Sequence, residues 1–373
     1  MLLALVYLYE FHTYGGGSLN GPFPMKSIVT QKDLAKATGL DQSTVSLALR
    51  GDSKVNEKTR ERVMKMARKM GYWKDPMMTA LASYRGGLRE STHQGTLAWL
   101  WDPAEEELPH FKDSVYVHYF NGAKRQAVQH GYQLEKFEVP ANPKDHRRLS
   151  DILFHRGIEG VLIPPQLVPG PAPQLDWDHF SAVTFGWSVT SPRFHSLSPN
   201  HYHNAIELVR NLALMGYRRI GGCVGLNKAE HFNFHLWSHG VETSTENLDG
   251  IANIPVFRMS KAEATYVDHF KRWYDQYRPE VIAVNIEHLN FIVGVLDGFG
   301  VRCPEDIGIA LFYRASQEGH YAGIYENPPY IGGAAVDLLV GTLRRREFGA
   351  PEIRRMLQVE GCWRPGPSVK SLV

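Results

Sequence analysis

With 373 residues, 43% of them hydrophobic, the chain is long enough to bury the cores of two or three domains. Its net charge of +2 is unevenly spread: residues 26–90 hold 14 Lys and Arg against 7 Asp and Glu, whereas residues 91–373 carry a net −4. A basic head on an acidic body indicates a polyanionic partner for the head alone. Three scattered cysteines argue against a disulfide frame or a zinc site.

The first 25 residues are expected to be disordered. Gly15–Gly17, Pro22 and Pro24 interrupt regular structure. The apolar run Leu2–Leu8 is too short to span a bilayer, no basic residue precedes it, and no clean cleavage site closes it. No membrane association is therefore expected, and the few cysteines favour a reducing cytoplasm.

Three short helices are expected next, between Ile28 and Gly71. Thr30 and Asp33 have the spacing of a capping box, and Gly39 supplies the left-handed residue that ends the first helix. Asp41 is a suitable N-cap for the second helix and Asn56 for the third. Two helices joined by a tight glycine-containing turn, with a third as support, predict a helix-turn-helix unit.

The second helix has an inward and an outward face. Its spacing turns three apolar residues inward, namely Val45, Ala48 and Leu49. It leaves four residues facing out, namely Gln42, Ser43, Ser46 and Leu47. The third helix buries Val63, Met66, Ala67 and Met70. A basic helix pair is often only a solvated surface, but the ordered pattern favours presentation of the second helix to the major groove of DNA.

These residues resemble the LacI/GalR family of bacterial repressors. The matching residues are Val29-Thr30, Asp33-Leu34-Ala35, Gly39-Leu40, Ser43-Thr44-Val45-Ser46, Leu49, Gly51, Val55, Thr59-Arg60-Glu61-Arg62-Val63 and Gly71-Tyr72. Family heads usually begin near Met25, which implies that residues 1–25 are a dispensable extension. The resemblance implies a head at 26–74, a hinge helix and linker at 75–92, and an effector-binding and dimerisation domain at 93–373.

The hinge implied by the resemblance spans Tyr72 to Arg85. In relatives this segment becomes a helix on the operator and inserts a leucine into the minor groove, and Leu81, followed by Ala82, falls at the matching place. The proline of the hinge differs in position, since Lys74-Asp75-Pro76 stands where relatives have Arg-Pro-Asn. The alternative is an ordinary helix whose Met77, Met78 and Leu81 pack on the body.

The recognition helix departs from the family pattern. Leu47 stands where relatives often have arginine, and Arg50 where they often have asparagine. Leucine cannot bond a guanine edge but can contact a thymine methyl, whereas Gln42 suits adenine. An operator unlike the commonest family half-site is therefore expected. The full set of expected DNA-binding residues is Thr30, Gln42, Ser43, Thr44, Ser46, Leu47, Arg50, Leu81 and Ala82, with Thr30 and Thr44 nearer phosphates.

The body alternates strand and helix signals, which implies parallel sheets covered on both faces. Expected strands are 96–101, 133–139, 158–163, 182–185, 220–224, 281–285 and 307–312; expected helices are 115–130, 147–154, 204–215, 261–277, 291–299 and 336–345. Segments 156–163, 214–220 and 300–309 resemble the periplasmic-binding-protein-like module of the same family. That resemblance implies two lobes joined by three crossovers, with a small ligand between them.

Ligands of open α/β sheets bind beyond the carboxyl ends of the strands. The effector-binding candidates there are Trp101, Asp102, Trp187, Asn285, Tyr313 and Arg314. The aromatic rings could stack on a sugar, and Arg314 indicates an acidic group on the ligand or a structural ion pair. Sugar-binding relatives have more carboxylates at these strand ends, so a plain hexose is not expected, and each residue has a purely structural alternative.

Enzymatic interpretations are weaker. The glycine-rich stretch 221–228 lacks phosphate-loop spacing and is interpreted as a strand end and turn. His231, His235 and His239 could align on one helix face, but no further ligand is spaced to complete a metal site. His195, His201 and His203 are interpreted as polar surface or cleft residues. We expect no catalytic residues, no metal and no cofactor.

Two functional classes follow. The first is a cytoplasmic transcriptional regulator, expected to be a repressor, which binds a near-palindromic double-stranded DNA operator as a homodimer and responds to a small ligand, a sugar or sugar derivative. The second is a solute-binding or carbohydrate-sensing protein with a vestigial head, which a secretory signal would favour.

Overall fold

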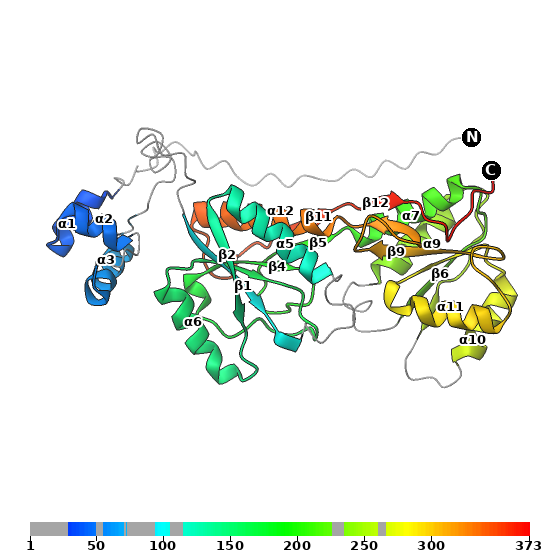
Figure 1. Ribbon diagram of the computed structural model, residues 1–373, viewed down its shortest axis with the longest axis horizontal. Coiled ribbons are helices and arrows are strands. Elements are labelled where there is room, and N and C mark those ends of the chain that lie inside the picture. The colour runs from blue at the N-terminus through cyan, green and yellow to red at the C-terminus, as the bar shows by residue number, and fades with distance from the viewer. Residues whose placement is uncertain are drawn as a thin grey trace, which may run out of the picture. The chain divides into compact units, whose positions relative to one another are not determined.

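The structure is a computed structural model that describes residues 29–49, 55–70, 72, 94–104, 115–225, 235–259 and 266–373 (Figure 1). The chain divides into two compact units, residues 1–90 and residues 91–373. The first unit is named the head and the second the body.

The head contains the three expected helices: α1 (Gln31–Thr38), α2 (Gln42–Leu49) and α3 (Glu57–Met70). The capping box is confirmed, since Thr30 accepts from the backbone N–H of Asp33 while the Asp33 carboxylate accepts from Thr30. Gly39 ends α1 with φ of 65°, and the Asn56 side chain accepts from the N–H of Thr59 over 2.8 Å. Arg62 of α3 donates to the carbonyl of Thr38, which ties α3 to the end of α1.

The core of the head is small and local. Its buried residues are Leu34, Val45, Ala48, Val55, Val63 and Ala67, all within one stretch of the chain. The inward faces expected for α2 and α3 are confirmed, with Leu49, Met66 and Met70 packed at the edge of this core. Leu47 differs from expectation: it is half-buried against the core and only part of it faces out.

The first lobe of the body is a parallel sheet between helices. Its strands run in the order β11-β5-β4-β3-β1-β2, all parallel, and the helices α5 and α12 pack side by side on one face and α6 on the other. The strands are β1 (Gly95–Trp101), β2 (Tyr132–Glu138), β3 (Gly160–Ile163), β4 (Ser181–Phe185), β5 (His195–Pro199) and β11 (Met356–Val359); the helices are α5 (Val115–Gln129), α6 (His146–His155) and α12 (Pro328–Arg345).

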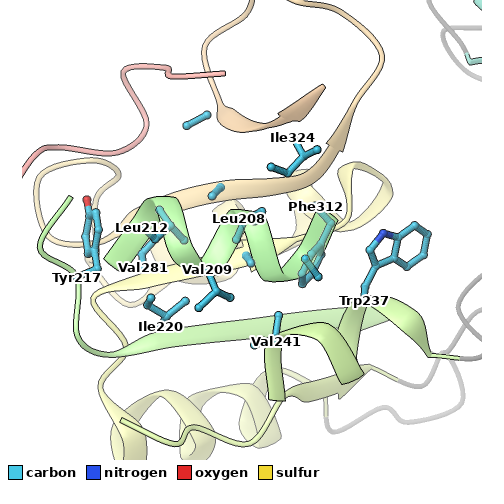
Figure 2. Packing of buried hydrophobic residues seen from close by; sticks show 14 of the residues in the cluster. Leu208, Val209, Leu212, Tyr217, Ile220, Trp237, Val241, Val281, Phe312 and Ile324 are labelled. Carbon is cyan, nitrogen blue, oxygen red and sulfur yellow. The ribbon is translucent and has the colours of Figure 1, made fainter. Parts of the chain in front are cut away.

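The second lobe repeats this plan. Its strand order is β12-β10-β9-β8-β6-β7, and every neighbouring pair is parallel except β12 with β10. The strands are β6 (Ile220–Gly225), β7 (Phe257–Met259), β8 (Val281–Val284), β9 (Gly308–Arg314), β10 (Ala322–Tyr325) and β12 (Cys362–Arg364); the helices are α7 (His201–Leu214), α9 (Leu236–Asn247), α10 (Tyr266–Tyr277) and α11 (Leu289–Gly298). Figure 2 shows Leu208, Val209 and Leu212 of α7 packing toward the sheet.

Glycines allow helices to approach closely in both lobes. A Cβ atom on Gly240 of α9 would lie 2.7 Å from the carbonyl oxygen of Tyr202 in α7. A Cβ atom on Gly332 of α12 would lie 2.0 Å from the carbonyl oxygen of Tyr119 in α5. Both contacts exclude any larger side chain, since atoms cannot approach this closely without displacement of the backbone.

The lobes are joined by three crossovers. They run from β5 to α7 through Asn200, from β10 to α12 through Glu326 and Asn327, and from β11 to β12 through Glu360 and Gly361. The late strand β11 thus belongs to the first lobe and pairs with β5, far earlier in the chain, with Met356 opposite Ser196. The fold class expected from the sequence is confirmed.

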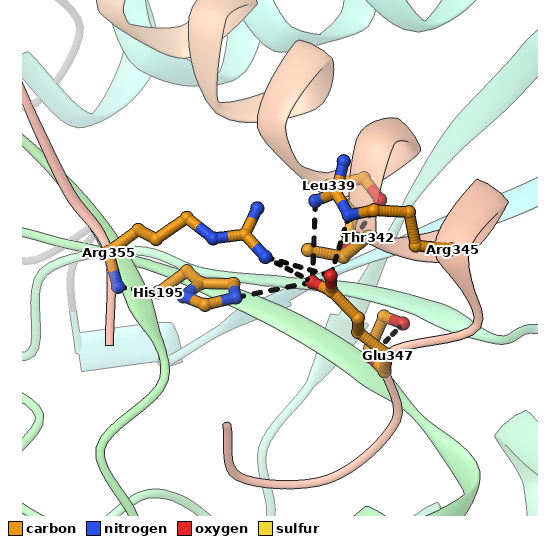
Figure 3. Close-up of polar contacts among 7 residues, drawn as sticks. His195, Leu339, Thr342, Arg345, Glu347 and Arg355 are labelled. Atoms are coloured by element: carbon orange, nitrogen blue, oxygen red, sulfur yellow. Dashed lines mark hydrogen bonds and ion pairs between the residues drawn. The ribbon is translucent and has the colours of Figure 1, made fainter. Parts of the chain in front are cut away.

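An ion-pair cluster fixes β11 to the first lobe (Figure 3). The Glu347 carboxylate accepts from Arg345 over 2.6 Å and from Arg355 over 2.8 Å. These two guanidinium groups lower the pKa of Glu347 to about 2. The ring of His195 is buried beneath, with Nδ1 accepting from the backbone N–H of Arg355, and burial together with the charge of Arg355 lowers its pKa.

The expected elements of the body are confirmed in type, and their ends shift by up to eight residues. The largest shift is in α12, which begins at Pro328 rather than at 336. The helix expected at 261–277 is α10, and the expected residues 261–265 lie outside the described part of the chain. Apart from short 3-10 turns, six elements of the described chain had no sequence expectation: β5, α9, β7, β10, β11 and β12. Five of these are short strands, whose few residues give weak periodicity. Among the described residues, no helix is long and apolar enough to cross a membrane.

Candidate functional site

The outward surface of α2 is the candidate DNA-reading surface. Gln42 and Ser43, at its first turn, are exposed, whereas Thr44, Ser46 and Leu47 are half-buried. Exposed polar residues at the start of such a helix are those that reach base edges in helix-turn-helix proteins. Three sequence-predicted residues, Arg50, Leu81 and Ala82, lie outside the described part of the chain.

A hollow of about 540 Å³ lies beside the start of α2. Gln42 and Thr44 line it from α2, and Lys32 and Lys36 line it from α1. The two lysines are exposed and one helical turn apart. The N-terminus of a helix and nearby ammonium groups both favour a phosphate. The sequence analysis did not single out Lys32 and Lys36, although their i, i+4 spacing on α1 was a readable signal.

A cluster of aromatic and acidic residues lies where the two lobes meet, and it is named the aromatic–acid cluster. Tyr313, at the end of β9, donates to Glu287 and stacks on Trp237 at 5.7 Å between ring centroids. Burial, followed by the charge of Glu287, raises the pKa of Tyr313 well above its ordinary value. Tyr119 comes from α5 in the first lobe, and burial and the charge of Glu326 raise its pKa in the same direction.

The other members of the predicted ligand site divide into two groups. Asn285 is buried directly after β8, two residues before Glu287 of the aromatic–acid cluster. Trp101 is half-buried at the end of β1 and faces a cation, since the Lys136 ammonium stands 5.1 Å from its ring centroid. Asp102 is exposed, and its carboxylate caps the N–H of Ala104.

Trp187 and Arg314 have partners that the sequence did not indicate. The Trp187 ring lies 5.5 Å from the guanidinium of Arg354, next to the start of β11, and so at the β5–β11 side of the sheet. Arg314 is buried and donates to the carbonyls of Gln317 and Pro365. Its described contacts are thus with backbone rather than with a carboxylate, which departs from the ion pair considered from the sequence.

Trp237 was missed by the sequence analysis, because it lies in α9, a helix without a clear apolar period. It is 5% exposed, and its indole Nε1 is buried without a hydrogen-bond partner among the described residues. A buried unpaired donor is costly, so a ligand oxygen that accepted from Nε1 would bind favourably. Its ring also contacts His201, at 4.5 Å between centroids.

The structure also places the glycine-rich stretch and most of the histidines singled out from the sequence. Residues 220–225 form strand β6, in agreement with the strand end predicted there. His195 and His201 are buried rather than on the surface. His235 is the N-cap of α9 in a left-handed conformation, and its ring lies 6.2 Å from that of His239 between centroids, whereas His231 lies outside the described residues. Within the described ranges, no group of His, Cys, Asp and Glu could hold a metal ion.

Comparison with known proteins identifies the head. Residues 30–75 match the family model described as bacterial regulatory proteins, lacI family. The match covers the described helices of the head and ends before the body. The resemblance to the LacI/GalR family noted from the sequence is thereby confirmed.

Longer stretches of the chain are similar to transcriptional regulators. The HTH-type transcriptional repressor CytR of Escherichia coli (strain K12) is 24% identical over 204 residues, which are 54% of this chain and 54% of CytR. The chain thus spans about half the length of this curated relative. The transcriptional regulator CelR–cellobiose complex covers 91% of this chain and 99% of its own, with a TM-score of 0.54 and 18% identity.

A second solved structure gives the same fold. The lac repressor dimer bound to operator and the anti-inducer ONPF covers 92% of this chain and 99% of its own, with a TM-score of 0.52 and 16% identity. At these identities the likeness shows the fold: a helix-turn-helix head followed by a two-lobed body with parallel sheets.

Proposed function

We propose that this protein is a sequence-specific DNA-binding transcriptional regulator that represses transcription, and that a small ligand bound between its lobes changes its affinity for the operator. The observation that carries the proposal is the LacI-family match over a head whose second helix exposes polar residues at its start. The aromatic–acid cluster between the lobes supports the ligand half of the proposal.

The contacts to DNA divide into two kinds. Gln42, Ser43, Ser46 and Leu47 read base edges, with Arg50 following them. Thr30 and Thr44 contact phosphates, and Lys32 and Lys36 add cations at the same place. Leu81, followed by Ala82, is the proposed minor-groove wedge. The part of Leu47 that stays exposed is apolar, which suits a thymine methyl better than guanine.

The ligand is proposed to be a sugar or sugar derivative. The stacked rings of Tyr313 and Trp237 offer an apolar surface, while Glu287 and Asn285 offer groups that bond hydroxyls. CelR, one of the solved structures similar to this chain, is a complex with cellobiose. Trp101 and Asp102 are proposed to contribute from the first lobe. Trp187 and Arg314 are proposed as weaker contributors to ligand binding. The ring of Trp187 already faces Arg354, and the guanidinium of Arg314 already donates to backbone carbonyls.

The assembly is proposed to be a cytoplasmic homodimer without catalytic activity. One short helix offers few base contacts, so two heads on one near-palindromic operator supply both affinity and half-site spacing. The similar lac repressor structure is a dimer on its operator. The similar proteins are regulators rather than enzymes, which supports a binding function.

The test is an electrophoretic mobility shift on the DNA upstream of the chain's own gene, at two salt concentrations and with competitor DNA. Specific retardation is expected, with affinity that falls steeply as salt rises. The double variant Lys32→Ala/Lys36→Ala should weaken binding to all sequences and lower the salt slope by about 2, since each lysine neutralises one phosphate. Retardation that competitor DNA abolishes would contradict the proposal.

The ligand half is tested separately by titration calorimetry with neutral sugars, amino sugars and sugar acids. Binding of a sugar is expected, and Trp237→Phe, which removes the unpaired indole donor but keeps a ring, should weaken it about fivefold to tenfold. Heat from none of these compounds would contradict a carbohydrate effector.

A further inference from the structure

All three crossovers between the lobes meet at one buried group of polar side chains. Asn204, in the first turn of α7, is 1% exposed; Glu326 is 3% exposed and His201 is 8% exposed. Together these three residues are named the hinge latch. Since His201 and Asn204 follow the first crossover and Glu326 lies in the second, the latch brings together parts of the chain that are far apart in sequence.

Hydrogen bonds of the latch connect the end of the first crossover to both of the others. Asn204 Nδ2 donates to Glu326 Oε1 over 3.3 Å, and His201 Nδ1 lies 3.0 Å from the same oxygen. Asn204 Oδ1 accepts from the backbone N–H of Gly361, in the third crossover, over 2.8 Å. A single side-chain amide thus bonds the second and third crossovers from the end of the first.

The packing around these bonds leaves little room for adjustment. A Cβ atom on Gly361 would lie 2.3 Å from Ile324 Cγ2 and 3.2 Å from Asn204 Nδ2. The backbone N–H of Asn200, in the first crossover, also donates to the carbonyl of Val359, the residue of β11 just before the third crossover. A rotation of one lobe against the other must change backbone angles in these segments, and it would strain or break bonds that are shielded from water.

The latch is also in contact with the aromatic–acid cluster. The His201 ring packs on Trp237 at 4.5 Å between centroids, and Trp237 stacks on Tyr313 with planes 19° apart. Packed rings leave no space between them, so displacement of Tyr313 moves Trp237 and then His201. The route from the proposed ligand to the hinge is therefore two ring contacts long.

We propose that Asn204, His201 and Glu326 act as a hinge latch, which holds the two lobes in one relative arrangement and receives, through Trp237, any displacement of Tyr313. The first half concerns the lobes alone. The second half rests on the proposed function, since it supposes a ligand beside Tyr313. Asn204 is the central positioning residue, because its amide bonds two crossovers at once.

The experiment measures the distance between the lobes in the full chain without DNA or ligand. Spin labels are attached to encoded ketone side chains at Asp151 and Gln276, which are exposed on α6 and α10, so that the three native cysteines stay unmodified. Pulsed electron paramagnetic resonance then gives the distribution of distances. Labelled protein is mixed with an excess of unlabelled protein, so that each labelled protomer of the proposed homodimer pairs with an unlabelled one. The wild type is then expected to give one narrow distribution.

Asn204→Ala is expected to widen this distribution at least about twofold, because the crossovers are no longer bonded to a common partner. Asn211→Ala is the matched control: the same residue type lies on the same helix, half-buried, and its described side-chain hydrogen bonds go to Glu207 within that helix. It should leave the distribution as in the wild type. Equal widths for Asn204→Ala and Asn211→Ala would overturn the latch.

Glu326→Gln keeps the test falsifiable if Asn204→Ala does not fold, because it preserves side-chain volume and one acceptor oxygen. An intermediate width is expected, and a wild-type width would overturn the proposal. Trp237→Leu tests the coupling between Tyr313 and the latch, since it removes the ring that packs on His201, and a wider distribution is expected. A distribution of wild-type width would overturn the coupling through Trp237 but not the latch itself. These measurements require neither DNA nor ligand, so a protein that bound neither would still test the latch.

Discussion

The head and the second lobe of the body differ in how their functional surfaces are assembled. In the head, the buried core and the exposed reading surface both come from one stretch, residues 29–70. In the second lobe, the aromatic–acid cluster takes Trp237 from α9, Glu287 from the segment after β8 and Tyr313 from β9, and it meets Tyr119 from the first lobe.

This difference determines what a substitution does. A local surface tolerates changes outside its few core residues but depends on each of those, because its core is small. A surface assembled from distant segments depends on the sheets and crossovers that bring them together. A substitution in the core of the head should therefore destabilise the head and leave the stability of the body unchanged.

The largest expected effect is the loss of the head through Leu34→Ala. Leu34 is fully buried in a core of six residues, and truncating a buried leucine costs about 3 kcal/mol, a large share of the stability of so small a unit. Operator binding should be lost while the main thermal transition of the body is unchanged. Calorimetry and a mobility shift assay on the full chain measure the two effects.

The matched control is Leu357→Ala on β11, where the leucine is 45% exposed. This substitution should lower the free energy of unfolding by less than about 0.5 kcal/mol, and the variant should still bind DNA. If Leu34→Ala also lowered the transition temperature of the body, the independence of the two regions would be wrong.

A change in base preference is the next largest effect. Leu47→Arg offers a guanidinium to a guanine edge at one position per half-site, worth about 2 kcal/mol of discrimination. The buried part of the leucine is replaced by the aliphatic stem of the arginine, so the head should stay folded. Selection from a random library of sites measures the preference; Leu47→Met, which stays apolar, should keep the original one. An identical preference for all three proteins would show that this residue does not read a base.

Features that depend on neighbouring residues could be predicted from the sequence, whereas contacts between distant segments could not. The caps at Thr30, Gly39 and Asn56 were predictable because each depends on residues at most a few positions away. Tyr313 and Asn285 could be proposed from strand ends, but no local pattern indicated that Arg314 would bond the carbonyls of Gln317 and Pro365. Trp237 and β11 were missed because their partners lie far along the chain.

The Glu347 cluster of the first lobe is expected to stabilise the body at neutral pH. The pKa of this carboxyl is about 2 in the folded protein, below its ordinary 4.5, so the cluster stabilises fully above pH 4.5 and loses its effect as pH falls toward 2. Because both arginines are about half exposed, the contribution at neutral pH is about 1–2 kcal/mol. Glu347→Gln should remove it.

Urea denaturation of the body at about pH 7 and about pH 3.5 measures this effect. The difference in free energy of unfolding between the wild type and Glu347→Gln should be smaller at the lower pH. Glu57→Gln in the head breaks a long pair with Arg60, 3.8 Å apart, in which the glutamate is exposed, and it should change the stability of the head by less than about 0.5 kcal/mol. A gap that widened with acid would mean that the arginines do not hold this carboxylate ionised.

The smallest expected effect returns to the head, at the capping box. Thr30→Ala removes the acceptor for the N–H of Asp33, at a cost of about 1 kcal/mol to the head. It also removes a hydroxyl donor that helps to lower the pKa of Asp33, so that pKa should rise toward its ordinary value of 3.8. Carboxyl titration by nuclear magnetic resonance follows the pKa, and thermal unfolding of the head follows the stability. Thr30 is also a proposed phosphate contact, so the loss of binding free energy for the operator should exceed the loss of unfolding free energy of the head. Equal losses of the two free energies would leave Thr30 as a helix cap alone.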